Sequence, residues 1–571
     1  MKLIDKRKVA ELLNNYISYL SVEKIQKIIE KPPAGIEYTY AFPTFKLAKH
    51  EKKNPVQIAK ELGERIDDSD IFEEITAKGP YINFMVKTSI VLDNIYTNQN
   101  NYGRFISKQR KNQFKPQRIV VEYPAPNTNK PLHLGHVRNM LIGSTLARIL
   151  EYIGHQVFDV NLNNDRGIHI CKSMLAYQKW GNGKKPDKKP DHFVGDYYVK
   201  YNQMLKKDEK LEEEAKELLK LWEEKDTEVR ALWKKLRKWA LEGFQETYKK
   251  FNITFDKEYY ESNFYYKGKK LILKGLEEEL FTERPDGAIV AELSKNYDLP
   301  DKVLLRSDGT SIYITQDIYL AHLKKKDFDY DKSIFIVGNE QRLYFQQLFA
   351  VLDMLGYTEE KFHLSYGMIN LPEGKMKSRE GKVVDADDLV KEMKILAYEE
   401  VNQRYPDLSN KEKLERAKII GMSALKFFIL KFNPMKDFVF NPEESISFEG
   451  ETGPYIQYCY ARIESIFNKS ELKPEGEIDF ELLRHENEIR LIKLLHYFPE
   501  IVKEATDTYG IHLIPQYLLD LTQQFNSFYS TCPVISNNEN LQKARLLLIK
   551  CVQIVVKCGL NLLGIKVLKE M

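Results

Sequence analysis

The alternation of hydrophobic and polar positions predicts a chain that begins with mixed elements, continues as a parallel α/β core and ends in helices. Asn54 followed by Pro55 is typical of a helix N-cap and first helical position, and opens the amphipathic segment VQIAKELGERI. The segment YINFMV at residues 81–86 is typical of a strand. The polar, basic stretch at residues 98–116 suits an exposed linker, and we place the first domain boundary there.

A βαβ unit follows this linker. The strand RIVVEY is succeeded by the loop PAPNTNKPLH, the helical segment GHVRNMLIGSTLARILEYI, the stop residue Gly154 and the strand QVFDVNL. Parallel sheets bind ligands beyond the carboxyl ends of their strands, where a helix N-terminus offers free backbone N–H groups to an anion. The loop between Pro124 and His136 is therefore the first candidate site.

This loop carries neither of the usual glycine-rich phosphate-binding patterns, and has instead His133, Leu134, Gly135 and His136. Two imidazoles three residues apart share one face of a helical turn, and a glycine between them lets a flat base or a phosphate approach closely. In the alternative interpretation, one of the histidines caps or packs the helix. The pattern alone leaves both interpretations open.

A second candidate site follows the apolar, strand-like segment KFHLSYGMINL. Gly374 and Gly381 bracket a basic loop, which suits hinge motion and the stabilisation of a triphosphate as pyrophosphate departs. The alternative is a solvated basic turn. The cations of this loop are Lys375, Lys377, Arg379 and Lys382.

The remaining stretches read as helices. Residues 181–285 predict long amphipathic helices with faces of mixed charge, packed as an insertion whose tryptophans Trp222, Trp233 and Trp239 belong to its core. From about residue 440 the periodicity is again helical, with abundant Leu, Ile, Tyr and Phe.

Composition narrows the class of protein. A length of 571 residues corresponds to roughly three or four folding units, and 43% hydrophobic with 30% charged residues excludes a disordered chain. A net charge of +4 means that any nucleic-acid surface is a local patch. Five scattered cysteines without a CxxC pair indicate neither a disulfide framework nor a zinc cluster. Because the N-terminus lacks a signal-peptide pattern and lysines interrupt the apolar tail, we expect no membrane span and a cytoplasmic location.

The two candidate sites together resemble a known family. HLGH after a first parallel strand and KMKSR after a late one are similar, in order and spacing, to the HIGH and KMSKS signatures of class I aminoacyl-tRNA synthetases. Longer segments resemble the arginyl-tRNA synthetases within that class, and with YINFMV and LNLLGIKVLKEM the resemblance covers essentially the whole chain. These segments are VEYPAPNTNKPLHLGHVRNMLIG, NDRGIHICKSMLAY, DGTSIYITQDI, VGNEQRLYFQQLF and GETGPYIQYCYARIESI.

The resemblance implies an α/β multidomain fold with a Rossmann-like parallel-sheet catalytic core, an N-terminal α+β domain and a C-terminal all-α helical bundle. Residues 1–110 would form the N-terminal additional domain that contacts the tRNA elbow. Residues 116–438 would form the catalytic domain, with the helical insertion at about 181–285, and residues 439–571 the anticodon-binding domain. The signature helix of that last domain carries residues that we expect to brace it against the catalytic core rather than to contact RNA: Tyr455, Gln457, Tyr458 and Arg462.

The activity that the resemblance implies is ATP-dependent activation of L-arginine to arginyl-adenylate, followed by transfer to the 3′ end of tRNA-Arg, with AMP and pyrophosphate as products. The implied partners are tRNA-Arg, ATP and L-arginine. Mg²⁺ would accompany ATP, and we expect no protein-bound metal or organic cofactor. The family also suggests that tRNA must be present before arginine is activated, and a monomer is expected.

For ATP, the resemblance implies that His133 and His136 contact phosphates and that Gly135 makes room for adenine. The basic loop, with Lys375, Met376, Lys377, Ser378 and Arg379, would clamp the pyrophosphate. One position departs from the general pattern, because Ser378 stands where many class I enzymes have a catalytic lysine. Lys130, three residues before His133, is the expected replacement, and Lys377 is the alternative.

For arginine, a planar guanidinium with five donors favours fixed carboxylates that accept in bidentate geometry. Tyr313 and Asp317 are four residues apart and would share a helix face. The resemblance implies that Glu122 and Asp317 bind the guanidinium with Tyr313 beside them, and that Asn127 and Gln341 hold polar groups including the α-amino group. Alternatively, Asp317 is a surface acid and Tyr313 a core aromatic.

Two other functions stay open at this point: another class I synthetase, such as a cysteinyl or glutamyl enzyme, and a non-catalytic tRNA-binding paralogue. The missing zinc ligands argue against a cysteinyl enzyme. A glutamate pocket would require cations where Glu122 and Asp317 stand. The presence of both histidines, the basic loop and the arginine ligands in one chain favours a catalytic arginyl enzyme over a paralogue.

Overall fold

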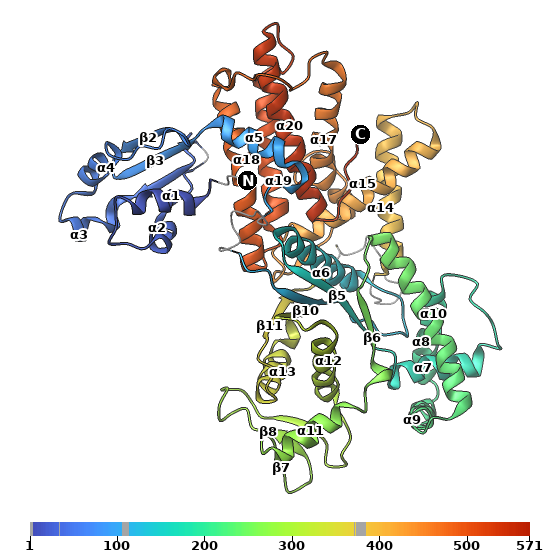
Figure 1. Cartoon of the computed structure of the whole chain (residues 1–571). Helices are drawn as coiled ribbons and strands as arrows, with labels where there is room; N and C mark the ends of the chain where they lie inside the picture. Colours follow the sequence, from blue (N-terminus) through green and yellow to red (C-terminus); the bar gives the residue numbers. More distant parts are fainter. Residues whose placement is uncertain (1–3, 34, 105–113, 371, 373–383) are drawn as a thin grey trace. The chain divides into compact units, whose positions relative to one another are not determined.

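The computed structural model describes residues 4–33, 35–104, 114–370, 372 and 384–571. The chain divides into two compact units. The first combines Met1–Phe114 with Ser447–Met571, and the second is the continuous segment Lys115–Ile446. Figure 1 shows the helices and strands of both units, many of them labelled.

The N-terminal part of the first unit is an antiparallel sheet in the order β1-β3-β2, covered by short helices. Helix α4 (Pro55–Gly63) begins as the sequence predicts, because the side chain of Asn54 accepts a hydrogen bond from the backbone N–H of Val56 at 2.9 Å. The strands are β1 (Tyr40–Pro43), β2 (Phe72–Lys78) and β3 (Tyr81–Val86), and the other helices are α1 (Lys6–Asn14), α2 (Val22–Ile28), α3 (Ala48–Glu51) and α5 (Thr88–Asn98).

The C-terminal part of this unit is all helical, as predicted. Its long helices are α17 (Gly453–Lys469), α18 (Glu486–Thr508), α19 (Leu513–Thr531) and α20 (Glu539–Leu562). Arg462 of α17 donates to Asn526 at 2.9 Å, and Asn526 in turn donates to the hydroxyl of Tyr455 at 2.7 Å. Gln457 donates to the carbonyl of Lys566 at 2.6 Å. These side chains therefore brace the helical domain internally.

The two parts of the first unit are joined by buried polar contacts. The hydroxyl of Tyr40 donates to Glu500 at 2.5 Å and lies 3.0 Å from Nε2 of His496. Lys31 adds an ion pair with Glu500 at 3.0 Å. Burial lowers the pKa of His496 to about 4, so this imidazole is neutral near pH 7.

The second unit is built on a parallel sheet of five strands in the order β11-β10-β4-β5-β6 (Figure 1). The predicted βαβ unit is confirmed: the helix between β4 and β5 is α6 (Leu134–Ile153), and it ends at Gly154, which has a φ of 120°. The strands are β4 (Arg118–Glu122), β5 (Gln156–Asn163), β6 (Lys257–Tyr260), β10 (Lys332–Gly338) and β11 (Glu360–Tyr366).

Further elements surround this sheet in sequence order. Helices α12 (Tyr313–Phe328) and α13 (Arg342–Met354) flank β10 along the chain, and α14 (Ala386–Arg404) and α15 (Asn410–Leu430) form an antiparallel pair. Two small sheets consist of β7 (Thr282–Glu283), β8 (Ile289–Ala291) and β9 (Lys302–Leu305), and of β12 (Ile369–Asn370) with β13 (Phe438–Val439), which precedes α16 (Pro442–Ser445).

The predicted helical insertion is only partly helical. It contains α8 (Pro190–Leu205), α9 (Lys210–Glu223), α10 (Thr227–Phe251) and α11 (Gly268–Glu277), after α7 (Ile168–Trp180). Trp222 and Trp233 are buried in one hydrophobic cluster, as predicted, and Trp239 is partly buried against Tyr177 and Phe193 of the same cluster. The difference is β6, four residues that return to pair with β5 at the sheet edge. The segment KEYY is too short and too polar to stand out as a strand.

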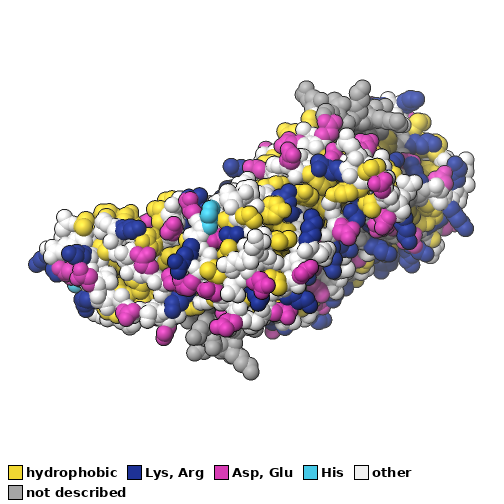
Figure 2. Space-filling view, turned by 90° about the horizontal axis from the view of Figure 1, so that it is seen from above, with side chains coloured by type: hydrophobic (Ala, Val, Ile, Leu, Met, Phe, Trp, Pro, Cys, Tyr) yellow, Lys and Arg dark blue, Asp and Glu magenta, His cyan; other side chains and the backbone are white. Residues whose placement is uncertain are grey.

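The surface carries charges of both signs. On the face seen in Figure 2, Lys and Arg side chains are interspersed with Asp and Glu, in agreement with the small net charge of +4. All five cysteines are buried free thiols. None of the helices in the described ranges has the length and apolarity needed to cross a membrane.

Candidate active site

The candidate residues gather at the carboxyl edge of the parallel sheet. Strand β4 pairs with β5 on one side and with β10 on the other, so the connections diverge from it in opposite directions. Doubly wound sheets bind ligands at such a switch point. Glu122, the last residue of β4, lies opposite Phe335 of β10. The predicted arginine ligand thus stands at the crevice that the topology creates.

The HLGH segment forms the N-terminus of α6. The Nδ1 atom of His133 accepts from the backbone N–H of Gly135 at 3.1 Å, and Nδ1 of His136 accepts from the N–H of His133 at 3.2 Å. The capping interpretation is therefore correct for the Nδ1 atoms. Because both Nδ1 atoms are acceptors, each neutral ring carries its proton on Nε2, which remains a donor. The two rings lie side by side, with centroids 3.8 Å apart.

The electrostatic surroundings of these rings suit an anion. Burial, with a smaller effect of Lys130, lowers the pKa of His133 to about 4, and the pKa of His136 is lowered further by burial, His133 and Lys130. Burial also lowers the pKa of the Lys130 ammonium. His169, near the start of α7, has its pKa lowered by burial, Lys172 and Lys130. An anionic ligand here would favour the charged form of all four groups.

A pH dependence of stability follows from His133. Its pKa is near 6.5 when unfolded and about 4 when folded, so the stability present above pH 6.5 is lost as the pH falls toward 4, by up to about 3 kcal/mol. His133→Asn keeps a capping oxygen but removes this titration. In thermal unfolding at pH 7 and pH 4.5, the variant should lose less stability than the wild type. Equal losses would contradict the assignment, and His50→Asn, at an exposed histidine, is the control.

Gly135 is required by the packing of His133. A Cβ atom at position 135 would lie 3.0 Å from Cε1 and 3.1 Å from Nδ1 of His133, closer than ordinary contacts. A side chain here would press on the ring that caps the helix. The glycine thus preserves the position of His133 as well as open space at the helix end.

The predicted guanidinium-binding acids form a polar cluster with two residues that the sequence did not indicate. Glu122 accepts a hydrogen bond from the buried ammonium of Lys324 at 2.7 Å. Asp317 of α12 accepts from the hydroxyl of Tyr344 of α13. Burial raises the pKa of Asp317 to about 7; Tyr344 lowers it, Glu122 raises it and Lys324 lowers it. The charge of Glu122 thus contributes to the raised pKa of Asp317, and a cationic ligand would be attracted to both acids.

The other predicted arginine ligands lie around the same edge. Tyr313 is the first residue of α12 and is 74% exposed, so the interpretation as a core aromatic is wrong; the tyrosine bonded to Asp317 is Tyr344. Asn127 pairs with Asn164 in a parallel bridge directly after β4 and β5. Gln341 is exposed at the start of α13, after β10. Both side-chain amides thus belong to loops at the carboxyl ends of strands.

The residues predicted for the basic loop, Lys375, Met376, Lys377, Ser378 and Arg379, lie outside the described residues. The chain after them returns to α6: the N–H of Leu134 donates to Val384 at 2.8 Å, and the N–H of Ala386 donates to Leu132 at 2.9 Å. Backbone hydrogen bonds on either side of His133 therefore tie the HLGH segment to residues 384–386, which lead into α14.

The chain before the basic loop is also bound to α6, through the buried guanidinium of Arg138. Its Nη1 donates to the carbonyls of Gly367 and Met368 at 2.6 and 2.8 Å. Its Nη2 donates to Pro434 and Lys436 at 2.9 and 2.7 Å. Burial lowers its pKa to about 10.

A charged cluster fixes the start of α14 against the insertion. Asp387 accepts from Lys189 at 2.6 Å, from Lys250 at 2.5 Å and from His192 at 3.0 Å. Asp191, His192 and Asp387 are close enough together to hold a metal ion. Since two ammonium groups already occupy the carboxylate oxygens of Asp387, we interpret the cluster as a structural ion-pair network.

Comparisons with known proteins agree with this geometry. Three family descriptions match in order along the chain: the arginyl tRNA synthetase N terminal domain at residues 6–86, the catalytic domain of tRNA synthetases class I (R) at 96–442, and the DALR anticodon binding domain at 456–571. An arginine–tRNA ligase of Treponema denticola is 43% identical, over 99% of this chain and 98% of that protein. The chain belongs to the arginyl-tRNA synthetase family.

Two further arginyl-tRNA synthetases are similar to this chain, one in sequence and one in structure. The arginine–tRNA ligase of Parabacteroides distasonis is 43% identical over 92% of both chains. The solved arginyl-tRNA synthetase of Thermus thermophilus superposes with a TM-score of 0.82 at 26% identity, with full coverage of both chains. The predicted fold class, with a parallel-sheet core between an N-terminal domain and a helical C-terminal domain, is thus confirmed for an arginyl-tRNA synthetase.

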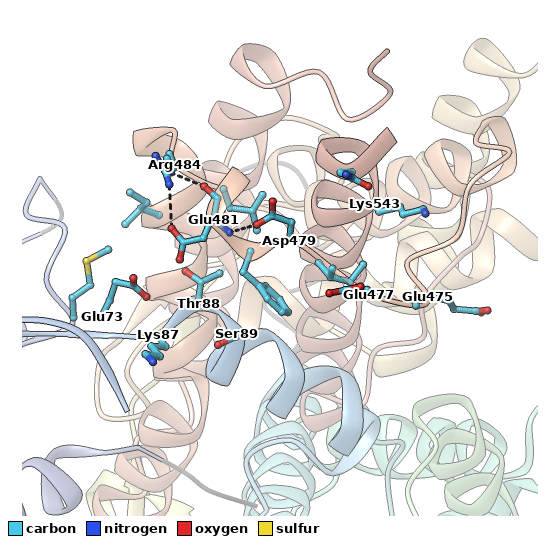
Figure 3. A pocket seen from close by; sticks show the side chains of 17 residues that line it. Glu73, Lys87, Thr88, Ser89, Glu475, Glu477, Asp479, Glu481, Arg484 and Lys543 are labelled. Atoms are coloured by element: carbon cyan, nitrogen blue, oxygen red, sulfur yellow. Dashed lines mark hydrogen bonds and ion pairs between the residues drawn. The ribbon is translucent and has the colours of Figure 1, made fainter. Parts of the chain in front are cut away.

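A separate cavity of about 870 Å³ in the first unit has a different character (Figure 3). Five carboxylates line it against three cations, so a nucleotide triphosphate is disfavoured there. Part of its wall is already bonded, since Glu481 pairs with Arg484 at 3.1 Å. Its charged residues are Glu73, Lys87, Glu475, Glu477, Asp479, Glu481, Arg484 and Lys543.

Proposed function

We propose that this chain is an arginine–tRNA ligase that activates L-arginine with ATP and transfers it to the 3′ end of tRNA-Arg. The observation that carries the proposal is the placement of two electrostatically coupled carboxyls, Glu122 and Asp317, at the same sheet edge as the HLGH helix start. Membership of the family agrees with it. The carboxyls suit a guanidinium, and the helix start suits phosphates.

In the first step, the carboxylate of arginine attacks the α-phosphate of ATP in line. A bond forms between a carboxylate oxygen and phosphorus, the bond to the pyrophosphate oxygen breaks, and arginyl-adenylate results. In the second step, a ribose hydroxyl of the terminal adenosine attacks the arginyl carbonyl and loses its proton, and AMP leaves. No protein nucleophile is needed, so catalysis rests on positioning and charge stabilisation.

The groups around α6 supply the phosphate side of this reaction. The Nε2–H donors of His133 and His136 would contact phosphate oxygens, because their Nδ1 atoms are engaged by the backbone. Lys130 would add a cation, and the basic loop would close on the pyrophosphate. ATP enters as its magnesium complex, with Mg²⁺ held mainly by phosphate oxygens and water.

The remaining domains would bind tRNA. We assign residues 1–110 to a domain for the tRNA elbow, 116–438 to catalysis and 439–571 to the anticodon. The first assignment rests on the match of residues 6–86 to the arginyl tRNA synthetase N terminal domain. A cavity of about 630 Å³ in this part is lined by Tyr38 and Tyr81, and its formal charges balance, because Glu30 and Glu37 offset Lys31 and Lys78. The protein would act as a cytoplasmic monomer.

The test is arginine-dependent exchange of pyrophosphate into ATP, with and without unfractionated tRNA and with the other nineteen amino acids as controls. Exchange with arginine plus tRNA alone is expected. Exchange with a different amino acid would assign the acids to another substrate, and absence of exchange under every condition would favour a non-catalytic paralogue.

Lys130 is expected to replace the missing lysine of the basic loop. Lys130→Ala should lower kcat about 10²- to 10³-fold, because a preorganised cation at the phosphates is lost. Lys377→Ala is the comparison, and should have a smaller effect. Single-turnover formation of adenylate measures both. Near-normal turnover of Lys130→Ala with loss in Lys377→Ala would reverse the assignment.

A further inference from the structure

Lys324 is a fully buried ammonium beside the site for a cation. Its Nζ donates to Glu122 at 2.7 Å and to the hydroxyl of Ser333 at 3.3 Å. The same Nζ lies 3.9 Å from the ring centre of Phe335, which is buried on β10. The side chain of Lys324 has no exposed surface. Contacts with strands β4 and β10 therefore fix the position of the ammonium, and Glu122 is its main counter-charge.

By itself, the Lys324 ammonium would repel the guanidinium of arginine and weaken its binding. Its presence therefore calls for a compensating effect on the two carboxyls. Two close carboxyls without a cation would share a proton, since both ionise only with difficulty at short range. With Lys324 charged and both carboxyls ionised, the three groups carry one net negative charge, which equals the charge that one guanidinium neutralises. The ammonium also holds one oxygen of Glu122 and leaves the other oxygen for a ligand.

We propose that Lys324 is a positioning residue that orients Glu122 and limits the arginine pocket to one net negative charge. The inference rests on the proposed function and deepens it, because it explains how the pocket selects a monocation. Lys324 contacts Glu122 rather than the substrate. The groups that face Asp317 are Lys324 on its own helix α12 and, from neighbouring elements, Tyr344 of α13, Glu122 of β4 and Glu261 ahead of α11.

The proposal predicts how protons are coupled to arginine binding. In the wild type, Asp317 has a pKa of about 7, so binding at pH 7 should release roughly half a proton. Without Lys324, Glu122 loses its counter-charge and the acid pair holds its proton more tightly. Arginine binding should then release close to one proton, and the affinity should recover as the pH rises.

The experiment is calorimetric titration of the full chain with arginine at pH 7 and pH 9, in buffers of different ionisation enthalpy, and separately with ATP. Lys324→Met should raise the Kd for arginine roughly 10- to 100-fold at pH 7 and less at pH 9, with more protons released and the Kd for ATP unchanged. Lys324→Gln, which keeps a donor for Glu122 without the charge, should show the same proton release if the Met variant fails to fold.

Lys325→Met on the same helix is the matched control, because Lys325 pairs with Asp329 and Glu359 at the surface, and its titration should equal that of the wild type. An unchanged Kd for arginine in Lys324→Met, or an equal loss at both pH values with unaltered proton release, would overturn the proposal. A wild-type chain that binds no arginine would overturn the proposed function itself, so the two failures are distinguishable.

Discussion

Asp317→Asn should weaken arginine binding by about two to three orders of magnitude, because a guanidinium then loses a buried counter-charge that contributes roughly 3–5 kcal/mol. The substitution preserves shape, and the amide oxygen can still accept from Tyr344. ATP, which we propose binds at the HLGH start of α6, should keep its affinity. The measurement is kcat/KM for each substrate in aminoacylation of tRNA-Arg. Equal losses for arginine and ATP would indicate misfolding or a different pocket.

At acidic pH, the affinity of the wild type for arginine should fall toward that of the Asp317→Asn variant. Asp317 has a pKa of about 7, so protonation below pH 7 removes the charge that the asparagine lacks. The Kd for arginine should rise about tenfold per pH unit below that value in the wild type and stay flat in the variant. Asp329→Asn is the matched control, since Asp329 is an exposed residue at the end of the same helix with a φ of 44°, which asparagine tolerates.

Arg138→Met should destabilise the second unit by about 3–5 kcal/mol and lower its thermal midpoint by at least about 6 °C. The buried guanidinium donates to four backbone carbonyls, those of the buried residues Gly367 and Pro434 and of the exposed residues Met368 and Lys436, and methionine can satisfy none of them. Differential scanning calorimetry measures the change.

Arg138→Lys separates geometry from charge. A lysine keeps the positive charge but lacks the planar fork that reaches two pairs of carbonyls, so an intermediate loss is expected. If the methionine variant had the same thermal midpoint as the wild type, water or a rearranged loop would have to donate hydrogen bonds to these carbonyls. The hydrogen bonds seen here would then contribute little.

Much of the fold could be predicted because its signals are local. The strand, helix and stop residue around the HLGH segment follow one another within about forty residues, and each has its own pattern. The start of α4 at Asn54 has equally local causes. Strand β6 was missed, because a short polar edge strand is specified by its pairing with β5 rather than by its own composition.

The candidate site was only partly predictable for the same reason. Glu122 and Asp317 could be found from the segments that carry them, but their partners come from other elements. Tyr344 reaches Asp317 from α13, and Lys324 reaches Glu122 across the sheet. A buried lysine has no special pattern in the sequence, although Lys324 lies seven residues after Asp317 and so on the same helix face. His169 lies in the segment NDRGIHICKSMLAY, which resembles the family, but no feature of the sequence around it indicates that it lies near Lys130.

The contacts of Tyr40 with Glu500 and His496 join the two ends of the chain, and this affects how the first unit folds during synthesis. The catalytic unit is one continuous segment and can fold as soon as it leaves the ribosome. The first unit needs residues from both ends of the chain. At about 5–20 residues per second, its N-terminal part waits roughly 20 to 80 s for the helix that buries Tyr40. During that interval the N-terminal part of a nascent chain exposes the surface that the C-terminal helices later bury. Two chains translated from the same messenger RNA could then form a domain-swapped pair.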